Sequence, residues 1–273
     1  MAQPSASASR SSLGPRVISA LVLAPVALIL VWLGGWALAA FTGFVAILMI
    51  FEWSRLTAAG GPGWARSATV AVLLAALFAA ALGAFGWALA MVLLGAAAAS
   101  LSGLATRPLA WLGAGIVYVG LPCLALLWLR GRSPQGLETV LWVLALVWAV
   151  DIGAYFAGRT VGGPKLAPRI SPSKTWAGLG GGVLAAILVG ALAAWAAGAS
   201  VASIAALSAG LAILEQAGDL MESAIKRHFH VKDAGSLIPG HGGVLDRVDG
   251  LIAVLIAVAG LSLAAGGSPL GWR

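Results

Sequence analysis

The feature that most limits how this chain can fold is a succession of apolar runs, each long enough to cross a bilayer. A transmembrane helix needs about 20 such residues. Nine runs meet this requirement, at residues 17–34, 36–52, 67–84, 86–102, 108–129, 137–157, 176–198, 201–225 and 248–267. Since 61% of the 273 residues are hydrophobic and only 9% are charged, a soluble domain is excluded. The sequence predicts an all-α, polytopic integral membrane protein with about nine transmembrane helices.

The basic residues between these runs are unevenly distributed. With a cytoplasmic N-terminus, thirteen of the sixteen Lys and Arg residues fall on the cytoplasmic side, and only Arg130, Arg132 and Arg273 fall outside. Cytoplasmic loops of membrane proteins show this asymmetry. Topology therefore explains the net charge of +7, and no nucleic-acid partner is expected. We expect a multi-pass protein of the cell (inner) membrane whose polar segments face the cytoplasm.

The chain divides into three regions. Residues 1–16 include a Ser/Ala-rich stretch and are expected to be a disordered cytoplasmic N-terminus. Residues 17–150 are expected to form transmembrane helices, and residues 151–273 a C-terminal transmembrane region that carries the functional site. The run 17–34 is interpreted as an anchor and not as a signal peptide, because further spans follow it. Cys123 is the only cysteine, so an internal disulfide is impossible and a small core side chain is expected there.

The segment 215–250 concentrates the polar side chains. It holds six of the nine acids and all three histidines. On a helix, Glu215, Asp219, Glu222 and Lys226 would form one polar stripe. Solvated charge at a helix end would explain part of this stripe. It does not explain Asp219, which falls within the apolar pattern and needs a partner or a cation there.

The second part of this segment interrupts the helical pattern and then begins another helix. Residues 238–243, IPGHGG, favour an irregular backbone that can approach a ligand closely. Asp246 and Asp249 follow, and capping the next helix is a sufficient role for Asp249. Asp219 and Asp246 would offer carboxylates from two segments, which suits Mg²⁺ when phosphates and water complete its shell. Positive charge for phosphate oxygens would come from Lys226, Arg227, Lys232 and Arg247.

A second polar segment, residues 151–178, lies between the sixth and seventh runs. A plain cytoplasmic loop would explain its basic residues. However, Asp151 falls within the apolar pattern. Ser171, Ser173 and Lys174 lie in a Gly/Pro-rich loop and could line a nucleotide phosphate site, although their spacing is not that of a P-loop.

Both polar segments resemble one known family. Residues 223–249 are similar, without a departure, to the signature of the integral-membrane phosphatidate cytidylyltransferases, the CDP-diacylglycerol synthases. The matching positions are Ser223-x-x-Lys226-Arg227, Lys232-Asp233-x-Gly235, Ile238-Pro239-x-His241-Gly242-Gly243 and Asp246-Arg247-x-Asp249. Residues 151–155 and 171–175 resemble the Asp-x-Gly-Ala-Tyr and Ser-Pro-x-Lys-Thr stretches of the same family. Ala177 departs from it, because many members carry an acid near that position, and the role of that acid is in doubt here.

The resemblance implies transfer of CMP from CTP to phosphatidate, giving CDP-diacylglycerol and pyrophosphate, with Mg²⁺ as cofactor. The expected partners are CTP, phosphatidate and the lipid bilayer, and a homodimer is expected because the family includes dimers. The lipid phosphate is already an anion, so catalysis reduces to positioning and charge neutralisation.

The residues of the two segments receive the following roles. Asp219 and Asp246 are assigned to the metal and, with Lys226 and Arg247, to catalysis. Substrate binding is assigned to Ser171, Ser173, Lys174, Arg227, Lys232 and His241. For His241, an ordinary hydrogen-bonding role in the loop explains the residue equally well.

Two other classes of membrane protein share some of these features. A transporter also buries charges among helices, but here the charges gather at one end and no inverted repeat is visible. A CDP-alcohol phosphotransferase begins its motif with D-x-x-D-G-x-x-A-R. Asp246, Asp249, Gly250 and Ala253 imitate that motif, but Val254 stands where Arg is required.

Overall fold

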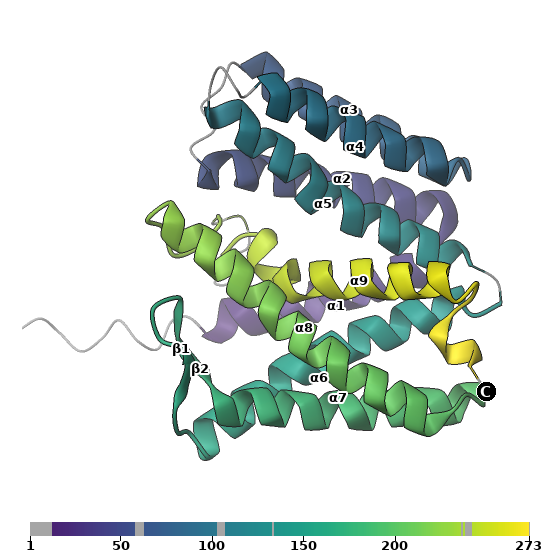
Figure 1. The fold of residues 1–273 in the computed structure, drawn as a ribbon, viewed down its shortest axis with the longest axis vertical. Helices are drawn as coiled ribbons and strands as arrows, with labels where there is room; N and C mark the ends of the chain where they lie inside the picture. The colour runs from purple at the N-terminus through teal and green to yellow at the C-terminus, as the bar shows by residue number, and fades with distance from the viewer. Residues whose placement is uncertain are drawn as a thin grey trace, which may run out of the picture.

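The computed structural model describes residues 13–57, 63–102, 107–132, 134–235, 237 and 242–272. Nine α-helices make up most of these described residues (Figure 1). They are α1 (Leu13–Leu33), α2 (Gly35–Leu56), α3 (Gly63–Ala81), α4 (Phe85–Ser102), α5 (Arg107–Gly131), α6 (Gly136–Thr160), α7 (Trp176–Ala197), α8 (Val201–His228) and α9 (Leu245–Ala264). The short elements are β1 (Lys165–Ala167), β2 (Ser171–Thr175) and the 3-10 turn η1 (Pro269–Gly271).

The helices lie where the apolar runs predict them. By length and composition, eight helices of the described part, α2 to α9, are able to cross a membrane. The predicted polytopic, nearly all-helical membrane fold is therefore confirmed. Helix α1 begins at Leu13 and so includes the last four residues of the segment 1–16. Residues 1–12 of that segment lie outside the described residues.

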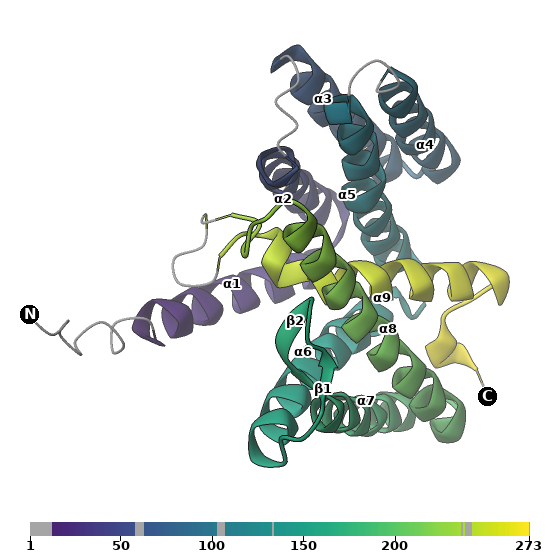
Figure 2. The ribbon, with the colours of Figure 1, turned by 60° about the vertical axis from the view of Figure 1, so that its left-hand side comes forward.

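The helices form two groups with α9 between them. Figure 1 shows α2 to α5 on one side and α6 to α8 on the other, and Figure 2 shows the same division from a second direction. Helix α9 packs against α2 and α5 of the first group and against α6 and α8 of the second. The two halves of the chain therefore meet along α9.

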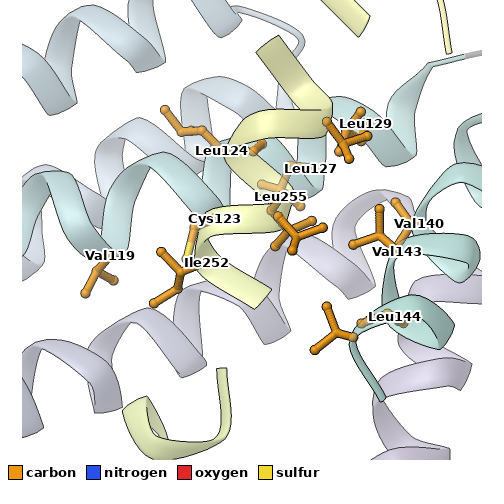
Figure 3. Close-up of a cluster of buried hydrophobic side chains, with 14 of the residues drawn as sticks. Val119, Cys123, Leu124, Leu127, Leu129, Val140, Val143, Leu144, Ile252 and Leu255 are labelled. Carbon is orange, nitrogen blue, oxygen red and sulfur yellow. The ribbon is translucent and has the colours of Figure 1, made fainter. Parts of the chain in front are cut away.

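The apolar core lies where α5, α6 and α9 come together. Figure 3 shows Val119 and Leu124 of α5, Val143 of α6 and Leu255 of α9 in one buried cluster. Cys123 belongs to the same cluster and is a free, buried thiol, as expected of a small core side chain. Close side-chain packing of this kind holds helices together in a membrane.

A β-hairpin interrupts the helical pattern between α6 and α7. Strands β1 and β2 pair antiparallel, with Lys165 opposite Thr175 and Ala167 opposite Ser171. Thr175 then caps α7, because its Oγ1 accepts a hydrogen bond from the backbone N–H of Gly178 at 3.0 Å. The sequence predicted only a loop in this segment, so the hairpin was not expected. The hairpin lies at the same end of the molecule as the end of α8 and the start of α9, opposite the C-terminus (Figure 1).

Candidate active site

An ion pair joins the two polar segments at this end of the molecule. Lys174, near the end of β2, places its Nζ 2.6 Å from Oδ2 of Asp219 on α8. The same ammonium donates a hydrogen bond to Oε1 of Gln216 at 2.9 Å. Asp219 therefore has the partner that its place in an apolar run requires.

A cavity of about 450 Å³ lies beside this ion pair. Its lining includes Ser173, Lys174 and Asp219, together with Tyr155 and Arg159 of α6. The Arg159 guanidinium donates a hydrogen bond to the Tyr155 hydroxyl at 3.2 Å. A cavity of this size falls in the range of small-molecule sites, and its cations and hydroxyls are suited to a phosphate-bearing ligand. Ser171 lies next to it, with its Oγ 3.5 Å from that of Ser173.

Further carboxylates surround Asp219. Asp151 of α6 lines the same cavity as Asp219 and Lys174. Asp249 of α9 lies close enough to Asp219 for the two negative charges to interact. Its Oδ1 accepts a hydrogen bond from the backbone N–H of Gly250 at 2.8 Å. Three helices and one strand thus contribute charge to a single region.

Lys226 and Asp246 form a second cluster. The ammonium of Lys226 lies 2.7 Å from Oδ1 of Asp246 and 3.1 Å from Oε1 of Glu222. Asp246 also accepts hydrogen bonds from the backbone N–H groups of Ala234, at 3.0 Å, and Gly243, at 2.8 Å. In this arrangement Lys226 neutralises two buried acids, and Asp246 ties the preceding loop to α9. Their assignments to phosphate and to metal stay predictions.

The remaining residues predicted from the sequence are more exposed. Arg227 donates to the backbone carbonyls of Ile170, at 3.3 Å, and Val231, at 3.2 Å, so it links the end of α8 to the hairpin. Lys232 and Arg247 are exposed at the same end of the molecule. His241 lies outside the described residues.

Two residues of the N-terminal helices contact these clusters and were missed from the sequence. The Tyr118 hydroxyl of α5 donates to Oε2 of Glu222 at 3.1 Å. Glu52 of α2 is buried and accepts hydrogen bonds from the backbone N–H groups of Val244 and Leu245, both at 2.9 Å. The argument used for Asp219 would have found Glu52, because a lone acid in an apolar run needs a partner.

The acids near Asp219 are of a type that could hold Mg²⁺ together with a substrate. Within the described residues, no three His, Cys, Asp or Glu side chains form a ready metal site. Mg²⁺ nevertheless needs only one or two protein carboxylates when substrate phosphates and water supply the other ligands. Asp249 lies within electrostatic range of Asp219. Both oxygens of the Asp246 carboxylate already accept hydrogen bonds, from Lys226 and from the backbone N–H groups of Ala234 and Gly243.

Comparisons with known proteins show which family the chain resembles. A model of the cytidylyltransferase family matches residues 14–263. The phosphatidate cytidylyltransferase of Brucella suis biovar 1 (strain 1330) is 43% identical over 253 residues, which cover 89% of this chain and 90% of the relative. The protein of the same name from Pseudomonas aeruginosa is 40% identical over 281 residues, covering 93% and 98%. These matches confirm the resemblance seen in the two polar segments, and the chain belongs to the cytidylyltransferase family.

Proposed function

We propose that this protein transfers CMP from CTP to phosphatidate and releases pyrophosphate. An oxygen of the lipid phosphate forms a bond to the α-phosphorus of CTP, and the bond from that phosphorus to the oxygen bridging to the β-phosphorus breaks. The product is CDP-diacylglycerol. The observation that supports this proposal most is the ion pair of Lys174 and Asp219 beside a cavity at the polar end of a membrane bundle.

The residues of the site would act by binding and by charge neutralisation. Ser171, Ser173 and Lys174 would bind a substrate phosphate at the cavity. The exposed cations Arg227, Lys232 and Arg247 would neutralise negative charge on the departing pyrophosphate. Because the attacking lipid phosphate is already ionised, the protein needs no strong base of its own.

Mg²⁺ is proposed as the cofactor, and it would offset negative charge on the triphosphate. Asp219 would be one ligand. The sequence favours Asp246 as the second ligand, whereas the hydrogen bonds that already occupy both oxygens of Asp246 favour Asp249.

We further propose that the protein lies in the inner membrane with this site on the cytoplasmic side. Support comes from the distribution of basic residues and from the gathering of the hairpin, the end of α8 and the start of α9 at one end (Figure 1). CTP is available on that side. A homodimer is also proposed, on the family resemblance alone.

The reaction can be tested with purified protein, phosphatidate, Mg²⁺ and CTP labelled in the cytosine ring. We expect label in the chloroform-extractable lipid and one pyrophosphate released for each labelled lipid. Attack at the γ-phosphorus would instead give unlabelled diacylglycerol pyrophosphate and CDP. A transporter would also leave the lipid unlabelled. Unlabelled lipid from folded protein would overturn the proposal, and Lys174→Met supplies the low-activity control.

A further inference from the structure

We propose that Glu52 of α2 is a positioning residue that fixes the start of α9 and, through it, the pair of Asp246 and Lys226. The proposal adds a role for the N-terminal helices that the signature motifs do not contain. Its activity measurements rest on the proposed function, whereas its structural measurement does not.

The side chain of Glu52 takes the place of a helix cap. Helix α9 begins at Leu245, and its N-cap residue Val244 makes no side-chain capping bond. The first N–H groups of a helix have no acceptor within the helix. Here Oε1 of Glu52 accepts from Val244 and Oε2 accepts from Leu245, each at 2.9 Å. Both carboxylate oxygens are therefore used to hold the beginning of a helix that lies 192 residues further along the chain.

The burial of the Glu52 carboxylate means that it needs these hydrogen bonds. Glu52 is only 2% exposed, and a buried carboxylate is tolerated only where hydrogen bonds or a cation compensate it. The partial positive charge at a helix N-terminus supplies such compensation. Asp246 directly follows the two residues that Glu52 holds, so a shift of their backbone would move its carboxylate away from Lys226.

Two glycines of the signature are packed against Glu52. A Cβ atom on Gly235 would lie 2.7 Å from Oε1 of Glu52, and one on Gly243 would lie 2.6 Å from Oε2. Neither glycine has a positive φ, so the backbone itself would accept alanine. The obstacle to a side chain at these positions is the carboxylate of Glu52.

Glu52 and Asp246 both contact the described residues at the two ends of the same loop. Gly235 and Gly243 pack against Glu52, while the backbone N–H groups of Ala234 and Gly243 donate to Asp246. Figure 2 shows the start of α9 close to α2. These described residues of the loop thus contact one carboxylate from α2 and one from α9, and loss of the first should loosen the contacts of the second.

The first test replaces Glu52 and follows both the loop and the reaction. Glu52→Gln keeps the size of the side chain but sets an N–H₂ group against a backbone N–H. We expect the kcat of Glu52→Gln to fall about tenfold, with the KM for phosphatidate changed less than about twofold. Amide hydrogen exchange in a peptide covering residues 242–250 should become at least about tenfold faster, while exchange in α7 stays unchanged.

Glu138→Gln is the matched control, because Glu138 is an exposed acid in the first turn of α6. It should change neither exchange nor turnover. Faster exchange throughout the helices of Glu52→Gln would indicate general destabilisation and overturn a local role, and so would unchanged exchange at residues 242–250. If the unmodified protein did not label lipid from CTP, the proposed function would fail, but the exchange measurement would still decide the role of Glu52.

The second test uses the packing of Gly235 against Glu52. Gly235→Ala alone should lower turnover about tenfold, because the new methyl group displaces the carboxylate. In a Glu52→Ala background the same substitution should cost less than about twofold more, since the obstacle is gone. Gly260→Ala on α9, where a Cβ meets nothing within 4 Å, should behave as the unmodified protein. Additive losses from Gly235→Ala and Glu52→Ala would contradict the proposal.

Discussion

The C-terminal region from residue 151 and the helices before it contribute to the site in different ways. The C-terminal region supplies many polar groups, among them the ion pairs of Lys174 with Asp219 and of Lys226 with Asp246. The N-terminal helices supply single polar side chains that hold those groups from outside. Chemistry is therefore concentrated in one region, and its orientation depends on isolated residues of the other.

The residues of the N-terminal helices that support the site are themselves held in place by contacts between α2 and α5. Trp53 of α2 packs against Tyr118 of α5, with ring centroids 4.9 Å apart. Its indole N–H donates to the backbone carbonyl of Trp111 at 2.7 Å. Neighbouring positions of α2, Glu52 and Trp53, thus reach α9 and α5. Substitutions in the C-terminal region should therefore cost the most activity, and those in the N-terminal helices should act through a C-terminal partner.

The largest effect is expected from Asp219→Asn. It removes the charge that pairs with Lys174 and a proposed ligand of Mg²⁺, so we expect turnover to fall on the order of a thousandfold. Asp246→Asn and Asp249→Asn then distinguish the second ligand. The variant that lacks the second ligand should need a higher Mg²⁺ concentration for its half-maximal rate. The other of these two variants should lose rate without a change in that concentration. Near-normal turnover of Asp219→Asn at high Mg²⁺ would contradict the assignment of Asp219 as a metal ligand.

A smaller loss of turnover and a large loss of stability are expected from Lys226→Met. Without the ammonium, Glu222 and Asp246 become unpaired buried acids, which costs about 3–5 kcal/mol of folding free energy. We expect about a hundredfold lower turnover. Thermal unfolding in detergent measures the stability, with Arg227→Met as the comparison, because Arg227 is exposed and, among the residues that the structure describes, donates hydrogen bonds to two backbone carbonyls. Equal stability of the two variants would show that Lys226 is not the structural link that its contacts indicate.

The sequence predicted those features of the structure that depend on residues close together in the chain. Long apolar runs set the helices, and motif spacing identified both polar segments. The hairpin was missed because its strands are only three and five residues long, and the second contains a proline. Such strands show no clear alternation of apolar and polar side chains. The pairing of Lys226 with two acids was also missed, since a motif shows a charge but not its partner.

Distance along the chain explains the other omissions. Glu52 meets its partners 192 and 193 residues away, and Tyr118 meets Glu222 104 residues away. A single polar residue in an apolar helix does not say which distant segment it contacts. The packing of α9 against both groups of helices decides this, and no local pattern encodes that packing.

The smallest effect is expected from Tyr118→Phe, which removes one hydroxyl and keeps the ring against Trp53. Oε2 of Glu222 would lose its donor at 3.1 Å, but Oε1 would still bind Lys226. We therefore expect turnover to fall only about threefold. A double-mutant cycle with Glu222→Gln shows whether Tyr118 acts through Glu222. If it does, the double variant should turn over at the rate of Glu222→Gln alone, because the hydroxyl has no carboxylate left to orient. Losses that simply multiply would mean that Tyr118 affects the reaction by a separate route, and the division between a chemical region and a supporting region would then not hold for α5.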